Sequence, residues 1–197
     1  MASRIFLVRH GETAWSLAGR HTSRTDLPLT ERGERDASAL GAELRAVDFG
    51  LVLSSPARRA RRTCELAGLP RTAEIEPGLA EWDYGEYEGR RTSEIVEERP
   101  GWDLFRDGCP GGETPVQVSD RADRFLAGLR ARAGDVAAFS HGHFGRVLAA
   151  RWIGLAVLEA RHFPLDSASV SILGLERGDS GVPVLALWNS RPWPRPS

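Results

Sequence analysis

Two histidines, each followed by glycine, stand just beyond short apolar runs in this chain of 197 residues. His10 follows the run 5–8 through Arg9, and His141 follows the run 136–139 one residue later. A positioned histidine can act as a nucleophile, and an arginine offers a rigid fork that suits phosphate oxygens. The pattern therefore indicates an anion site with a histidine nucleophile, and phosphate is the expected anion.

An arginine-rich segment follows a third apolar run, 51–53. We expect it to be a helix that opens with Ser55 as N-cap and Pro56 in the first turn. On a helix of 3.6 residues per turn, one arc of about 100° holds the charged residues that should face solvent: Arg58, Arg61, Arg62 and Glu65. The opposite side should face the sheet: Ala57, Ala60, Cys64 and Ala67. Arg59 lies on the flank beside Thr63 and is placed to reach over the sheet edge.

Short strand patterns alternate with helical patterns along the chain. Strands are expected at 5–8, 51–53, 73–75, 136–139, 169–175 and 182–188, the last two paired through a turn at 178–181. Helices are expected at 30–47 with Thr30 as N-cap, from Ser55 onward, and at 114–133 and 144–153. This alternation predicts an α/β fold with a mainly parallel central sheet. In such a sheet, the strand ends that precede His10, Ser55 and His141 meet at one edge, where ligands bind.

The composition narrows the function classes. The net charge of -1 argues against a general nucleic-acid partner. All 26 positive residues are arginine, which excludes Schiff-base lysine chemistry and a Walker-type lysine. Cys64 and Cys109 show neither disulfide-framework nor zinc spacing, and the pair His141-x-His143 lacks a third metal ligand. Without an apolar stretch of membrane-span length or a secretory leader, we expect a cytoplasmic protein with no membrane partner. One domain should cover 1–190, and the Pro-rich tail 191–197 should be flexible.

Five blocks of sequence, in order, resemble the histidine phosphatase superfamily, also called the phosphoglycerate-mutase-like family. The first is Leu7-Val8-Arg9-His10-Gly11-Glu12-Thr13. The others lie at 25–33, at Ser54-Ser55-Pro56-Ala57-Arg58-Arg59-Ala60, at 79–89 with Glu81, and at Ser140-His141-Gly142. The resemblance implies a three-layer α/β/α sandwich and an enzyme that needs neither metal nor cofactor.

The resemblance also implies the catalytic roles. His10 attacks phosphorus and becomes phosphorylated, while Arg9, Arg59 and His141 hold the phosphoryl oxygens. Glu81 protonates the leaving oxygen and then helps water to attack the phosphohistidine.

Further residues are candidates for substrate binding. Ser16 stands where the family often has Asn and can still donate one hydrogen bond to phosphate. Gly142 and His143 begin a helix whose free N–H groups favour an anion, and a glycine after each histidine lets the backbone approach a ligand. The remaining candidates are Glu12, Thr22 and Ser23, with Trp15, Trp82 and Tyr84 as an aromatic rim or as packing.

The function that these residues predict is hydrolysis of small phosphorylated metabolites by a compact acid phosphatase. One alternative is a phosphoglycerate mutase of the cofactor-dependent type, but Asp83 would repel a carboxylate substrate and a lysine is lacking. Another is a non-catalytic phospho-ligand module, which should have lost some of the catalytic residues. A homodimer is also expected, with 182–188 as an edge strand.

Overall fold

The structure, a computed structural model, describes residues 2–69, 73–130, 132–176 and 181–191. A six-stranded sheet runs through it in the order β3-β2-β4-β1-β5-β6. The strands are β1 (Ala2–Arg9), β2 (Phe49–Ser54), β3 (Glu74–Ile75), β4 (Gly134–Ser140), β5 (Val170–Leu175) and β6 (Pro183–Ser190). The strands β1, β2, β3 and β4 run parallel to one another. β5 is antiparallel to β1, and β6 is antiparallel to β5. The prediction of a mainly parallel sheet is confirmed, and β6 lies at an edge. Most of the predicted 178–181 turn and of the predicted tail lies outside the described residues.

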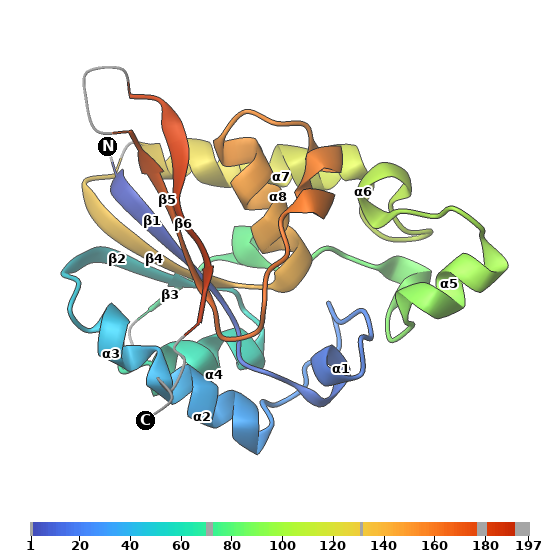
Figure 1. Ribbon diagram of the computed structural model, residues 1–197, viewed down its shortest axis with the longest axis horizontal. Coiled ribbons are helices and arrows are strands. Elements are labelled where there is room, and N and C mark those ends of the chain that lie inside the picture. The colour runs from blue at the N-terminus through green and yellow to red at the C-terminus, as the bar shows by residue number, and fades with distance from the viewer. Residues whose placement is uncertain (1, 70–72, 131, 177–180, 192–197) are drawn as a thin grey trace.

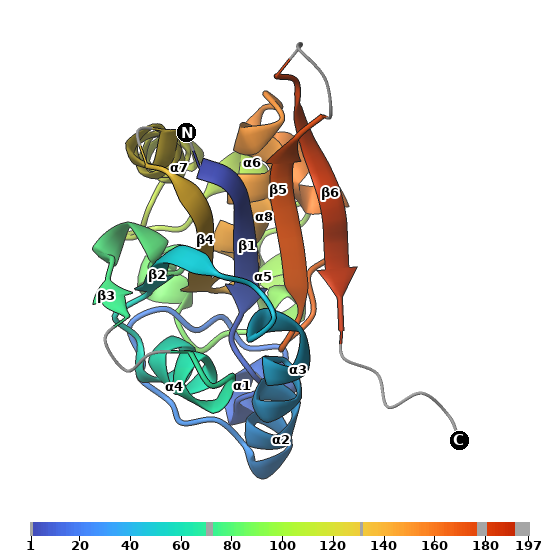
Figure 2. The same ribbon diagram turned by 90° about the vertical axis from the view of Figure 1, so that its left-hand side faces the viewer.

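Helices cover both faces of the sheet, which confirms the α/β/α sandwich. Figure 1 shows α7 and α8 on one side of the sheet and α2, α3 and α4 on the other, and Figure 2 shows the strands next to one another from β3 to β6. The α-helices are α1 (Ala14–Leu17), α2 (Glu31–Ala39), α3 (Gly41–Leu44), α4 (Arg58–Leu66), α5 (Thr92–Glu98), α6 (Leu104–Asp107), α7 (Pro115–Arg130) and α8 (Gly142–Trp152). Three 3-10 turns add Pro77–Leu79, Gly85–Tyr87 and Val157–His162.

Alternation along the central strands divides the core in two. Side chains of a strand point to opposite faces in turn. Ile5 and Leu7 of β1 therefore belong to the cluster under α7 and α8, whereas Phe6 and Val8 belong to the one under α2, α3 and α4. The central strands are buried on both sides, which explains why they read as continuous apolar runs.

Helix α4 has the faces that its spacing predicts. Ala60, Cys64 and Ala67 are buried against the sheet, Arg58 and Arg61 are exposed, and Arg59 is 0% exposed. The predicted N-cap was wrong: the cap position is Ala57, without a side-chain hydrogen bond. The hydroxyl of Ser55 is oriented elsewhere, as shown below.

The long helix predicted over 30–47 is broken into α2 and α3, although Thr30 does cap α2 by accepting the N–H of Gly33. At the break, the N–H of Glu43 bonds the Leu40 carbonyl, three residues back instead of four. Gly41 lies so close to the Ala67 carbonyl that a Cβ would come within 2.7 Å of its oxygen. The end of α4 therefore packs closely against the start of α3.

Candidate active site

The carboxyl ends of β1, β2 and β4 lie side by side, as the topology requires. Arg9 pairs with Ser140 across β1 and β4, and Ser54 pairs with Phe139 across β2 and β4. The next residues, His10 and His141, therefore approach each other, with ring centroids 5.1 Å apart at an interplanar angle of 67°. Both are buried, at 5% and 1% exposure. The structure thus brings the two predicted histidines into one site.

The ring of His10 is held in one orientation. Its Nδ1 lies 2.7 Å from the carbonyl oxygen of Gly11. A carbonyl can only accept a hydrogen bond, so we assign the proton to Nδ1, which leaves the lone pair of Nε2 free. Burial, followed by the charges of Arg59 and Arg9, lowers the pKa of His10 well below its usual value. The free imidazole is therefore neutral, as a nucleophile must be.

Three polar atoms around the histidines are buried without a hydrogen-bond partner. They are Nε of Arg9, Nε of Arg59 and Nδ1 of His141. Buried polar groups are nearly always paired, so three orphans in one place indicate that a ligand completes them. Both arginines are otherwise anchored, Arg9 by the Leu165 carbonyl and Arg59 by three carbonyls of the preceding loop: Thr22, Ser23 and Thr25. Two fixed positive groups and an unpaired imidazole nitrogen suit an oxyanion.

Ser55 belongs to the site, although the sequence analysis interpreted it only as a helix N-cap. Its Oγ lies 2.7 Å from Nε2 of His141. It also accepts the N–H of Ala57 at 3.3 Å, so it links the end of β2, the start of α4 and the second histidine. Burial, then Arg59 and His10, lowers the pKa of His141 well below its usual value. His141 is therefore neutral, and the Ser55 hydroxyl holds its ring in place.

Glu81 reaches the same place from the segment after the first 3-10 turn. Its Oε1 accepts the N–H groups of Trp82 and Phe144, at 2.9 and 2.8 Å, and its Oε2 accepts that of His143 at 3.1 Å. The free N–H groups expected at the start of α8 do exist, but they bind this carboxylate. The interpretation of the helix start as a direct anion site is therefore revised: α8 holds the predicted proton donor.

Arg121 of α7, which the sequence analysis did not single out, supports the segment that carries Glu81. Its guanidinium bonds the carbonyls of Gly78, Ala80 and Glu81 at 2.8 to 3.3 Å. It also pairs with both carboxylate oxygens of Glu113, at 2.7 and 2.8 Å, and stacks 4.0 Å from the Phe144 ring. Sequence spacing gives no signal for such a contact, because the partners are about forty residues apart.

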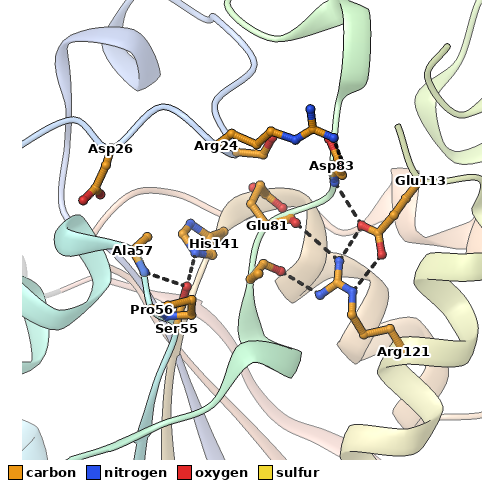
Figure 3. A pocket seen from close by; sticks show the side chains of 12 residues that line it. Arg24, Asp26, Ser55, Pro56, Ala57, Glu81, Asp83, Glu113, Arg121 and His141 are labelled. Carbon is orange, nitrogen blue, oxygen red and sulfur yellow. Dashed lines mark hydrogen bonds and ion pairs between the residues drawn. The ribbon is translucent and has the colours of Figure 1, made fainter. Parts of the chain in front are cut away.

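Two cavities meet at Glu81, which lines both. The smaller, about 190 Å³, is lined by Arg9, His10, Tyr84, Gly142 and Arg146 among others. The larger, about 570 Å³, lies on the side of Ser55 and His141. Figure 3 shows Glu81 and His141 in the middle of the larger cavity, between Asp26 on one side and Glu113 with Arg121 on the other.

The predicted substrate-binding residues are distributed over both cavities. Ser16, Thr22, Gly142 and His143 line the smaller one, and Ser23 lines the larger. Their polar groups are partly engaged already. The Ser16 hydroxyl donates to the Thr13 carbonyl, that of Thr22 to the Arg20 carbonyl and that of Ser23 to Glu88, while Nδ1 of His143 bonds the Tyr84 hydroxyl at 2.6 Å.

Two expectations need correction, and for Trp82 the structure selects packing, one of the two alternatives left open. Glu12 bonds the Thr30 hydroxyl at 2.8 Å and lines neither cavity, because its side chain turns toward the start of α2. Trp82 is no rim residue, since it is 0% exposed and donates its ring N–H to the Glu113 carbonyl. Gly11 serves backbone packing instead of ligand approach: a Cβ there would lie 2.5 Å from the Gly33 carbonyl oxygen.

The described part of the chain holds no group of three or more His, Cys, Asp or Glu residues that could bind a metal ion. Nor is any helix within those ranges both long and apolar enough to cross a membrane.

Comparison with known proteins agrees with this geometry. Residues 5–191 match the model of the histidine phosphatase superfamily (branch 1). The chain belongs to this family, and it is a metal-independent enzyme of the histidine phosphatase type.

Individual relatives cover nearly all of the chain. It is 44% identical to an acid phosphatase of Mycobacterium tuberculosis, over 93% of this chain and 92% of the relative. It is 37% identical to sedoheptulose 1,7-bisphosphatase of Saccharomyces cerevisiae, over 80% and 70%. A solved Mycobacterium tuberculosis structure superposes with a TM-score of 0.90 at 42% identity, covering 98% of this chain and 100% of that one.

Proposed function

We propose that this chain is an acid phosphatase that hydrolyses phosphomonoesters of small metabolites through a phosphohistidine on His10. The observation that carries the proposal is the set of buried, unpartnered polar atoms of Arg9, Arg59 and His141 beside a neutral His10. A phosphoryl group supplies acceptor oxygens to the two guanidinium N–H groups and a phosphorus atom to the imidazole.

The reaction has two displacements at phosphorus. In the first, Nε2 of His10 forms a bond to phosphorus while the ester P–O bond breaks, and Glu81 gives its proton to the departing alkoxide. In the second, Glu81 takes a proton from water, whose oxygen attacks phosphorus as the P–N bond to His10 breaks. Arg9 and Arg59 neutralise charge on the phosphoryl oxygens in both steps. Inorganic phosphate leaves, and the enzyme returns to its starting state.

The similarity to relatives supports hydrolysis. The Mycobacterium relative carries the name acid phosphatase and the yeast relative that of a sugar bisphosphatase, and both names describe phosphate-ester hydrolases. Asp83 lines the larger cavity, where it opposes a substrate carboxylate of the kind a phosphoglycerate mutase must hold. Interconversion of 2- and 3-phosphoglycerate should therefore be slower than hydrolysis, and the reverse order of rates would favour the mutase.

The direct test is turnover of p-nitrophenyl phosphate with a strong chelator present, in wild type and in His10→Ala. Wild type should hydrolyse the ester and carry a phosphate bound to the protein during turnover. This phosphate should be lost when the reaction is quenched with acid and should remain when it is quenched with base. His10→Ala should lose both signals, because the nucleophile is gone. Near-normal turnover by His10→Ala would overturn the mechanism, and absence of turnover in the wild type would favour a binding module. The homodimer and the cytoplasmic location remain predictions, the first to be tested by the molar mass in solution.

A further inference from the structure

The larger cavity is the place for the group that is esterified to phosphate. In phosphoryl transfer, the attacking and leaving atoms lie roughly in line across phosphorus. His10 lines the smaller cavity, and Glu81 stands where the two cavities meet. The leaving oxygen must therefore lie near Glu81, with the rest of the alcohol directed away from His10. Of the two cavities, only the larger, at about 570 Å³, falls in the range of ~300–1,000 Å³ that is usual for small-molecule sites.

The larger cavity is also built to receive a ligand. Nδ1 of His141, which lines it, is buried and unpartnered. His141 is held by Ser55 through its other ring nitrogen. The unpaired nitrogen and Glu81 together mark the end of the cavity where the ester bond lies.

The cationic groups around the rest of this cavity are already paired with carboxylates. Its two lining arginines are both paired with carboxylates that also line it. Arg24 lies 2.5 Å from Asp83, and Arg121 lies 2.7 Å from Glu113 (Figure 3). A second anionic group on the substrate would have to displace one of these carboxylates from its arginine.

Asp26 adds a negative charge on another side of the same cavity (Figure 3). Its Oδ1 accepts the backbone N–H of Arg58 at 2.8 Å, which satisfies one oxygen without cancelling the charge. Asp26 is exposed and lines the cavity. Asp26, Asp83 and Glu113 therefore offer carboxylate oxygens in this cavity to hydroxyl or ammonium donors, and they repel anions.

Resting on the proposed function, we infer that the substrate is the phosphomonoester of a neutral or cationic alcohol, and that the Arg24–Asp83 pair excludes esters with a second anionic group. Asp83 determines this preference because it forms an ion pair with Arg24, the more exposed of the two arginines that line the cavity. Arg121 cannot replace Arg24 in this respect, since its guanidinium is fixed to Glu113 and to three carbonyls.

The test compares two-carbon phosphate esters that differ in their terminal charge. Values of kcat/KM are measured for ethanolamine phosphate, which carries an ammonium, and for phosphoglycolate, which carries a carboxylate, with p-nitrophenyl phosphate as the reference. Wild type should prefer ethanolamine phosphate by tenfold or more. Equal rates, or a preference for phosphoglycolate, would overturn the inference while leaving hydrolysis of the aryl ester, and thus the proposed function, intact. Loss of activity toward all three esters would remove the proposed function and this inference with it.

Two variants move the preference in opposite directions. Asp83→Asn keeps an oxygen that can accept the Gly85 N–H but releases Arg24, so the ratio of phosphoglycolate to ethanolamine phosphate turnover should rise about tenfold. Arg24→Gln leaves Asp83 unpaired and should lower that ratio further. Arg24 is largely exposed, so this variant tests the inference even if Asp83→Asn fails to fold. The exposed Asp120 of α7 provides the matched charge control, because Asp120→Asn should leave the ratio unchanged. A ratio that neither Asp83→Asn nor Arg24→Gln alters would contradict the inference.

Discussion

The hydroxyl of Ser55 and Nε2 of His141 lie 2.7 Å apart and join the carboxyl ends of two adjacent strands, β2 and β4. Ser55 bonds Nε2 of His141, and the other ring nitrogen, Nδ1, has no hydrogen-bond partner in the protein. A single hydrogen bond thus fixes which nitrogen of His141 can meet the substrate.

Removing this hydroxyl should therefore slow the reaction. In Ser55→Ala, Nε2 of His141 loses its partner, at a cost of about 1–2 kcal/mol for an unsatisfied buried group. If that cost falls on the transition state, kcat for p-nitrophenyl phosphate should drop about five- to thirtyfold. Ser54→Ala is the matched control, because the neighbouring hydroxyl is equally buried but bonds a backbone carbonyl. Equal kcat in wild type and Ser55→Ala would show that His141 needs no support from Ser55.

The role of Ser55 shows where sequence interpretation reaches its limit. Ser-Pro before a helix is typical of an N-cap, and local pattern alone favours that interpretation. The hydroxyl turns to His141 instead, a partner 86 residues away, because β2 and β4 are neighbours in the sheet. Local propensity cannot indicate a hydrogen bond that depends on strand order.

The fold itself was largely predictable, because the buried strands are continuous apolar runs and α4 has one small apolar face. The helices that were missed are short: α1 and α6 have four residues each and α5 has seven, too few to show a clear helical period. The predicted cluster of His10, His141, Arg9, Arg59 and Glu81 does come together. The support given by Arg121 and the α8 N–H groups was not predicted, since both depend on tertiary contacts.

Glu81→Gln tests the proton donor. Glutamine can still accept N–H bonds from the start of α8 through its carbonyl oxygen, but it cannot protonate a leaving oxygen. General acid catalysis contributes about 10²–10⁴-fold, so kcat for an alkyl phosphate should fall by at least about 100-fold. A good leaving group needs no proton, and p-nitrophenyl phosphate should lose much less. Glu97→Gln, an exposed change on α5, should affect neither ester. Equal losses on both substrates would assign the acid to another residue.

The titration of His10 tests the electrostatics of the nucleophile. Its pKa is lowered first by burial and then by Arg59 and Arg9, so the free imidazole should stay neutral well below pH 6.5, the ordinary histidine value. In the ligand-free enzyme, NMR of the His10 ring carbon should show no protonation at pH 6. Arg59→Gln removes a positive charge and should raise this pKa. Arg61→Gln removes the same charge from the exposed face of the same helix and should leave the pKa unchanged. Identical titrations in all three proteins would exclude a role for Arg59 in setting the charge of His10.

His21 should make the fold sensitive to acid. It lies buried among aromatic side chains, with ring centroids 4.6 Å from Tyr84, 5.6 Å from His143 and 5.9 Å from Trp102. Burial lowers its pKa to about 4, against a smaller opposing effect of Glu88. Because the unfolded chain binds this proton near pH 6.5 and the folded chain does so only near 4, the stabilisation is present above pH 6.5 and is lost as the pH falls between these values.

The size of that loss can be measured by denaturant unfolding at two pH values. Between pH 7 and pH 4.5, His21 should account for about 2–3 kcal/mol of the fall in the free energy of unfolding. His21→Gln should lower the free energy of unfolding at pH 7 through lost packing. The fall in the free energy of unfolding from pH 7 to pH 4.5 should be smaller in this variant than in the wild type, by about the amount assigned to His21. His162→Gln, which also removes a histidine but an exposed one, is measured alongside as the control. The buried histidines of the active site titrate in all three proteins and cancel in the comparison. If His21→Gln and the wild type lost equal stability on acidification, the charge state of His21 would not contribute to the acid sensitivity of the fold.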